Sequence, residues 1–237
     1  MAEDFFPDTG AKAKSGAILD QLAAAASASG EAPEADNNGG TGLAKGSPAA
    51  LPPVERWNPP FCGDIDMRIA RDGTWYYCGT PIGRPALVRL FSTILRKDPE
   101  RYVLVTPVER VGISVEDAPF IAVEMTVTLE SGEQILRFRT NVEDWVTVDA
   151  GHPVRFETGA ADGIKPYVRV RGDLWALVTR ALFFDLVALG EIKEHDGTRL
   201  FGVASAGAFF AIANAGDVEQ IEAADAIEEA HARHGTL

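Results

Sequence analysis

The sequence predicts an α+β fold built from two related subdomains of antiparallel strands with one helix each. Short segments with alternating apolar residues are bounded by Gly, Pro and Asp, which is typical of strands joined by tight turns. Two longer segments carry apolar residues at helical spacing. An apolar fraction of 46% is sufficient to bury a core. We divide the 237 residues into a flexible N-terminal tail with a short helix (1–51), an N-terminal α+β subdomain (52–110), a C-terminal subdomain (111–213) and an acidic tail of helical propensity (214–237).

The N-terminal tail lacks the apolar residues that a folded segment needs. Residues 30–53 are rich in Gly, Ala, Pro, Asn and Ser, so burial cannot offset the entropy lost on ordering. Before them, residues 15–27 place Ile18, Leu19 and Leu22 on one face of a short helix. Such a helix is marginal alone, so we expect it to need a partner surface, and a protein partner is one candidate.

The N-terminal subdomain contains one hairpin, one helix and one further strand. Residues 66–77 alternate around Asp72-Gly73, a hairpin signal. Residues 85–95 begin with Pro85 and continue with apolar residues at helical spacing, which predicts a helix. Residues 102–106 predict a strand that Pro107 ends.

The C-terminal subdomain is predicted to contain several short strands and one long helix. The helix covers residues 173–189, with Asp173 as its N-cap and Gly190 at its end. A small curved sheet capped at one end by this helix fits that order. The predicted strands are 120–129 and 134–140, which form a hairpin, then 145–148, 154–156 and 167–170, and a closing hairpin of 200–203 and 208–212.

The order of elements repeats within the chain. A hairpin, a helix and a strand occur at 66–106, and the same order recurs at 154–203 with helix 173–189 in the role of 86–95. This repeat predicts a duplication, which a shared strand order would support.

Charge and cysteine content limit the classes of function. The net charge of −13 is concentrated at the two ends, which argues against nucleic-acid or anionic-membrane partners. Because no segment approaches the roughly 20 apolar residues of a spanning helix and the start has no secretory pattern, we expect a soluble cytoplasmic protein. Cys62 and Cys78 are expected to be reduced and structural, with a redox pair as the alternative if two strands bring them together. No cofactor and no metal site are predicted.

Several motifs occur in a fixed order between about Pro52 and about Phe210. They are W-x-P-x-x-C-G from residue 57, D-x-x-I-x-x-x-G-x-W-x-Y from 66, G-T-P-I-x-R from 79, L-V-x-L-F-S at 87–92, T-P-V-E from 106, V-E-D-A-P-F from 115 and T-N-V from 140. This set resembles a bacterial family catalogued as domain of unknown function 1285. The resemblance implies two related α+β subdomains, the C-terminal one loosely similar to pleckstrin-homology domains. It also implies signal transduction through a nucleotide-like ligand bound between the subdomains, with a link to oxidative stress and no assigned catalytic residue.

Six residues are candidate ligand contacts. Arg84 stands directly before the helix that Pro85 begins, where a guanidinium and free N–H groups favour an anion, although a salt bridge to Asp64 or Asp66 is the alternative. Tyr76 has a ring that can stack on a ligand, and Arg169 is expected to share a strand face with Arg171. Asn141 stands at a strand end. The acids Glu109 and Asp117 complete the set, and turn capping or ion pairing is the alternative role for both.

The leading prediction is a cytoplasmic ligand-binding or sensory protein that takes a small phosphorylated or nucleotide-like molecule between its subdomains. The first alternative is a metal-dependent hydrolase or phosphotransferase that uses Glu109, Asp117 and His152. The second alternative is a protein-interaction module that works through the helix at 15–27.

Overall fold

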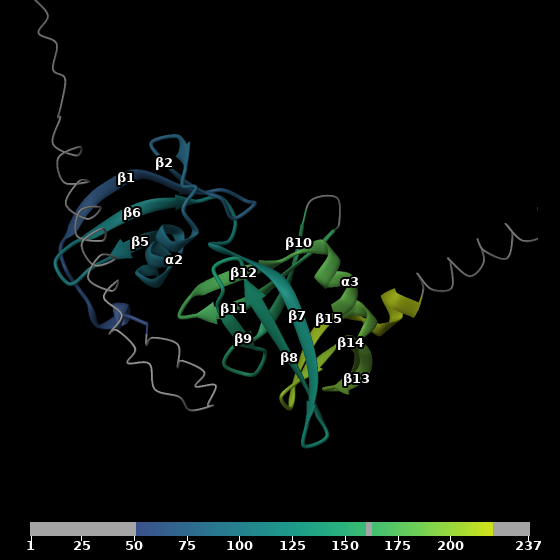
Figure 1. Cartoon of the computed structure of the whole chain (residues 1–237). Helices are drawn as coiled ribbons and strands as arrows, with labels where there is room; N and C mark the ends of the chain where they lie inside the picture. The colour runs from purple at the N-terminus through teal and green to yellow at the C-terminus, as the bar shows by residue number, and fades with distance from the viewer. Residues whose placement is uncertain (1–50, 160–162, 220–237) are drawn as a thin grey trace, which may run out of the picture. The chain divides into compact units, whose positions relative to one another are not determined.

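The computed structural model describes residues 51–159 and 163–219, which form two compact units with their boundary in the sequence between Glu116 and Asp117 (Figure 1). We call these the N unit and the C unit and describe each by itself. The expected helix at 15–27 and the acidic segment after residue 219 lie outside the described residues. None of the helices within the described ranges has the length and apolar character needed to cross a membrane.

The N unit is a six-stranded sheet with one α-helix. The strands lie in the order β3-β2-β1-β6-β5-β4. Its elements are η1 (Val54–Arg56), β1 (Phe61–Ile69), β2 (Trp75–Tyr77), β3 (Thr80–Pro81), α2 (Pro85–Thr93), β4 (Leu95–Asp98), β5 (Arg101–Val105) and β6 (Arg110–Val115).

The predicted hairpin and helix of the N unit are confirmed. Strands β1 and β2 pair antiparallel with Ile69 opposite Trp75, and Gly73 in the turn has a φ of 81° that suits glycine. Helix α2 begins at Pro85 as expected. Its Phe91 is fully buried and stacks on Trp75 with ring centroids 6.2 Å apart, so this pair fixes the helix on the sheet.

The C unit contains a second six-stranded sheet and a small third sheet. The strand orders are β10-β11-β12-β7-β8-β9 and β13-β14-β15. The elements are β7 (Phe120–Glu130), β8 (Glu133–Thr140), β9 (Trp145–Thr147), β10 (Val154–Thr158), β11 (Ile164–Arg171), β12 (Leu174–Val178), α3 (Arg180–Ala188), β13 (Glu191–His195), β14 (Thr198–Ser205) and β15 (Ala208–Asn214). The predicted hairpins β7–β8 and β14–β15 are confirmed.

Both six-stranded sheets have the same topology, which supports a duplication. In each sheet the first and last strands, β1 with β6 and β7 with β12, pair parallel at the centre. The expectation of purely antiparallel strands is therefore wrong for the central pair. The repeated segments are also not those predicted, because they cover 61–115 and 120–178. Helix α2 lies between the two halves of its sheet in sequence, whereas α3 follows the last strand, so the two helices are not equivalent. The pleckstrin-homology-like arrangement is not confirmed.

The predicted helix at 173–189 is wrong in its first part. Residues 174–178 form β12, in which Leu174, Ala176 and Val178 are buried in strict alternation. The apolar residues of this segment also have helical spacing, but hydrogen bonding to β7 and β11 on either side stabilises the strand over the helix. The helix begins at Arg180 with Thr179 as its N-cap in place of Asp173.

The cysteines do not form a redox pair. The N–H of Cys78 donates to the carbonyl of Asp66, so Cys78 lies opposite Asp66 on β1 and not opposite Cys62. Both thiols are free.

Candidate functional site: an arginine-lined pocket

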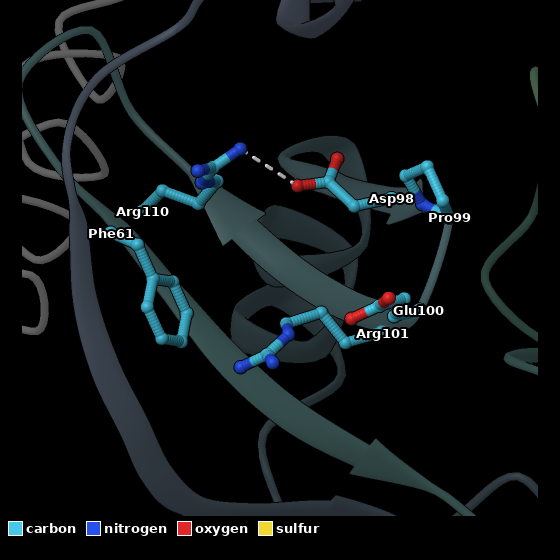
Figure 2. Close-up of a pocket in the computed structure, with 6 residues that line it drawn as sticks. All are labelled: Phe61, Asp98, Pro99, Glu100, Arg101 and Arg110. Atoms are coloured by element: carbon cyan, nitrogen blue, oxygen red, sulfur yellow. Dashed lines mark hydrogen bonds and ion pairs between the residues drawn. The ribbon is translucent and has the colours of Figure 1, made fainter.

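The N unit contains a pocket of about 380 Å³ at the ends of four of its strands (Figure 2). The parallel pairing of β1 with β6 places Phe61 beside Arg110. The turn between β4 and β5 places Asp98 opposite Arg101. The lining residues are Phe61, Asp98, Pro99, Glu100, Arg101 and Arg110.

Two guanidinium groups lie close to one aromatic ring in this pocket. The Cζ atom of Arg101 is 4.7 Å from the centroid of the Phe61 ring, and that of Arg110 is 5.9 Å away. Both distances are within the range of a cation–π interaction. The ring therefore helps to hold two positive charges on one side of the pocket.

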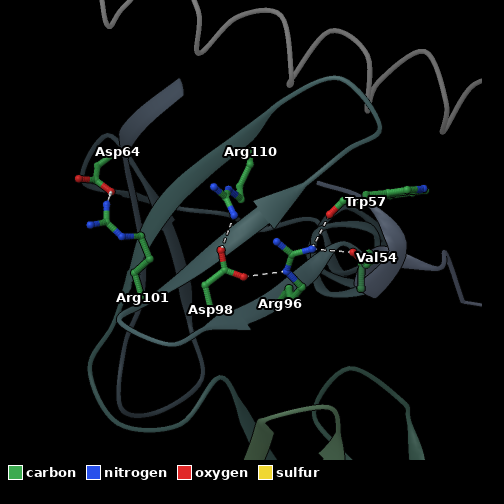
Figure 3. A network of polar contacts seen from close by, with 7 residues as sticks. All are labelled: Val54, Trp57, Asp64, Arg96, Asp98, Arg101 and Arg110. Atoms are coloured by element: carbon green, nitrogen blue, oxygen red, sulfur yellow. Dashed lines mark hydrogen bonds and ion pairs between the residues drawn. The ribbon is translucent and has the colours of Figure 1, made fainter. Parts of the chain in front are cut away.

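An ion-pair network that includes the buried Arg96 holds Arg110 in place (Figure 3). Asp98 accepts from Arg96 Nε at 2.8 Å and from Arg110 Nη1 at 2.9 Å. The side chain of Arg96 is only 9% exposed, and its Nη1 also donates to the carbonyls of Val54 and Trp57 at 2.7 Å. One carboxylate thus compensates two guanidinium groups, and the same network anchors η1.

Arg101 is held much less firmly than Arg110. Its nearest carboxylate is Asp64 at 3.5 Å, and the side chains are 43% and 71% exposed. Exposed pairs of this kind contribute little, about 0–1 kcal/mol. In addition, Nε of Arg110 is buried and has no hydrogen-bond partner. The pocket can therefore offer the exchangeable guanidinium of Arg101 to an anion, while the Glu100 carboxylate can accept from a ligand donor (Figure 2).

None of the residues that line this pocket is among the predicted ligand contacts. Phe61 and Arg110 are far apart in the chain and meet only through the parallel β1–β6 pair. The run D-P-E-R at 98–101 was the one available signal, because Pro after Asp in a charged run favours a turn.

The predicted site residues of the N unit lie elsewhere. The ring of Tyr76 is covered by Arg68, whose Cζ is 4.3 Å from the ring centroid, and Arg68 is ion-paired with Glu116. Arg84 is the exposed N-cap residue of α2 and makes no side-chain capping bond. Its role as an anion contact stays a prediction.

Glu109 is the one acid in the described part of the chain that is both buried and left with an unpaired oxygen. Its residue is 9% exposed, and its Oε1 has no hydrogen-bond partner. The Thr106 hydroxyl accepts from the Glu109 N–H at 3.2 Å, and the Thr106 N–H donates to the Glu109 carbonyl at 2.9 Å, so the turn is fixed. Burial raises the pKa of the Glu109 carboxyl above its usual range.

This burial predicts that Glu109→Gln changes the pH dependence of stability. Because the folded-state pKa lies above the unfolded one, the native protein loses stability as pH rises through this interval, and the loss is complete above the folded pKa. The variant lacks this titration, so its unfolding free energy relative to that of the parent should be higher at pH 7.5 than at pH 4. Urea unfolding at both pH values measures the gain. An equal difference at the two values would contradict the assignment.

The predicted residues of the C unit are all engaged within that unit. Asp117 accepts from Lys165 Nζ and from the Tyr167 hydroxyl, both at 2.6 Å. Asn141 Oδ1 accepts from the N–H of Ile121 at 3.0 Å, which ties the end of β8 to β7. Arg169 Nε donates to the carbonyl of Gly172. As ligand contacts, Asp117, Asn141 and Arg169 stay predictions.

Arg169 and Arg171 do not share a strand face as expected. The β11–β12 register shifts between them, which breaks the two-residue alternation. Arg171 instead pairs with Asp144 at 2.6 Å and lies over the ring of Phe120.

Two of the groups proposed for metal-dependent catalysis, His152 and Asp117, make local contacts within the C unit. His152 Nδ1 is 3.2 Å from Asp149 Oδ1 within one turn, and Asp117 already has two partners. Across residues 51–159 and 163–219, no group of three or more His, Cys, Asp or Glu side chains is placed to hold a metal ion.

Comparison with known proteins gives one family for both units. Residues 52–118 match the model "Domain of unknown function (DUF1285), N-terminal domain", and residues 119–212 match that of the C-terminal domain. A DUF1285 family protein from Silicibacter pomeroyi DSS-3 is 49% identical, with 73% of this chain and 93% of that one covered and a TM-score of 0.67. One from Shewanella baltica OS155 is 26% identical over 52% of this chain and 91% of that one, with a TM-score of 0.43. No curated protein matches the chain.

Proposed function

The chain belongs to the family of domain of unknown function 1285, and we propose that it is a cytoplasmic receptor for a small phosphorylated or nucleotide-like ligand, acting in signal transduction. We place the ligand in the arginine-lined pocket of the N unit. The observation that carries the proposal is the approach of Arg101 and Arg110 to one Phe61 ring, with Arg101 only weakly paired.

The charges of the pocket favour a ligand that is more than a simple anion. Arg101 and Arg110 suit a phosphate, because a guanidinium presents its donors in a planar fork. Asp98 and Glu100 balance these charges, so a plain polyanion gains little in net attraction. A nucleotide-like molecule adds base donors that Glu100 can accept from. The volume of about 380 Å³ lies near the lower end of the roughly 300–1,000 Å³ that small-molecule sites occupy.

A thermal-shift screen with nucleoside mono- and diphosphates, with and without magnesium, tests the proposal. Stabilisation without turnover supports a receptor, because a ligand at about 100 times its Kd adds about 2.7 kcal/mol to the unfolding free energy. Magnesium-dependent release of phosphate would instead support the hydrolase alternative. If no nucleotide raises the melting temperature, nucleotide-like molecules are excluded as the ligand.

Arg101→Gln should weaken the binding of the best nucleotide about 10- to 100-fold, because a hydrogen bond to a charged group contributes about 1.5–3 kcal/mol. Titration calorimetry measures the change. Arg89→Gln is the matched control, since Arg89 is exposed on α2 and does not line the pocket. Equal affinity of the Arg101→Gln and Arg89→Gln proteins would exclude this pocket. Arg84→Ala in the same titration tests the predicted contact at the start of α2.

A further inference from the structure

The C unit contains a larger pocket that differs in character from the arginine-lined pocket of the N unit. It has a volume of about 580 Å³ and lies where the first turn of α3 meets the beginning of β11 and the end of β12. Its walls are mainly apolar and include Ile164, Pro166, Val178, Phe183 and Phe184. We call it the α3 pocket.

The apolar wall of the α3 pocket is incompletely covered in the described part of the chain. Phe184 is 57% exposed and Ile164 is 39% exposed, although both side chains are large and apolar. Pro166 and Val178 form a buried floor. An open hollow of this kind, with apolar walls, suits the hydrocarbon part of a ligand.

The charged residues that line the α3 pocket in the described part of the chain are both basic. Arg180 and Lys165 line it, and no Asp or Glu does so among the described residues. Lys165 is neutralised by Asp117 at 2.6 Å. Arg180 has no carboxylate partner in residues 51–159 and 163–219; its Cζ lies 5.5 Å from the Phe184 ring centroid. An exposed guanidinium beside an apolar hollow can pair with the anionic head group of a ligand whose apolar part fills the hollow.

We propose that the α3 pocket binds an amphipathic carboxylate with an unbranched hydrocarbon chain. The carboxylate pairs with the guanidinium of Arg180, and the chain lies against Ile164, Pro166 and Phe183. The first turn of α3 contains no acidic residue that would repel the head group. This site is independent of the nucleotide-like ligand, because it uses other residues in the other unit.

The test is a titration of the full ¹⁵N-labelled chain with hexanoate, octanoate and decanoate below their micellar concentrations. Saturable amide shifts should appear at Ile164, Lys165 and Phe184. Affinity should rise about fourfold for each added methylene, which is the ratio expected for its burial. Octanol and decanol should bind at least tenfold more weakly than the matching acids. Shifts that never saturate, or equal binding of alcohol and acid, would overturn the proposal.

Three substitutions complete the test. Arg180→Gln should weaken octanoate binding tenfold or more and leave octanol unaffected, whereas Arg199→Gln, at an exposed arginine of β14, should change neither. An unchanged octanoate affinity in Arg180→Gln would also overturn the proposal. Leu22→Ser in the full chain tests another occupant: shifts at the pocket amides without added ligand would assign the pocket to residues 15–27 of the chain itself.

Discussion

Asp98→Ala should lower the unfolding free energy of the N unit by about 3–5 kcal/mol, the cost of removing one partner of a buried ion pair. The substitution leaves the 9%-exposed side chain of Arg96 without its one carboxylate partner among residues 51–159 and 163–219, and it frees Arg110 from the same carboxylate. The expected loss is a large part of the 5–15 kcal/mol that typically separates folded from unfolded states. Amide hydrogen exchange of Val103 and Leu104, which are fully buried on β5, measures this loss directly.

Asp64→Ala is the matched control for Asp98→Ala. It removes the same type of side chain from the same unit, but its pair with Arg101 is long and exposed. We expect a loss below about 1 kcal/mol. Similar losses for the two variants would show that burial of the Arg96–Asp98–Arg110 network does not determine its contribution.

The same network explains why the arginine-lined pocket can be preformed. Arg96 is fixed by two carbonyls of the segment around η1 and by Asp98, and Asp98 in turn fixes Arg110 (Figure 3). The proposed ligand would therefore meet a guanidinium whose side-chain entropy is already lost, which would lower the cost of binding. Arg101, which lacks such support, can adjust to the ligand.

Local elements of this fold were predictable from the sequence because their turns carry strong signals. Asp72-Gly73 and the E-S-G-E run at 130–133 each join alternating segments, and the structure has hairpins at both. Pro85 correctly marked the start of α2. These signals involve neighbouring residues, so no knowledge of the rest of the fold is needed.

The parallel strands and the pocket were not predictable by the same reasoning. Residues 110–115 read R-V-G-I-S-V, and only their place beside β1 at the centre of the sheet shows that they form a strand. Residues 174–178 satisfy both a helical and a strand pattern, and pairing with β7 decides between them. Since the arginine-lined pocket depends on the β1–β6 pair, its residues could not be grouped before that pair was known.

Gly202→Ala should destabilise the C unit by about 3 kcal/mol, the upper part of the range for overpacking. An added Cβ at Gly202 on β14 would overlap the carbonyl oxygen of Phe210 and lie 2.7 Å from the ring of Phe209 and 2.9 Å from Cα of Ala211. Two of these three atoms are backbone atoms of β15, so the overlap is relieved only by separating the strands. Urea unfolding followed by circular dichroism measures the loss.

Gly112→Ala provides the contrast, because the added Cβ would overlap only the carboxylate of Asp64. That side chain is 71% exposed and can rotate away at the cost of its weak pair with Arg101. The smaller entropy of the unfolded alanine chain offsets this cost, so the change in stability should stay within about 1 kcal/mol. Release of Arg101 should also tighten nucleotide binding in the arginine-lined pocket. A loss as large as that of Gly202→Ala would show that Asp64 cannot move, and that Arg101 is less available to a ligand than its exposure indicates.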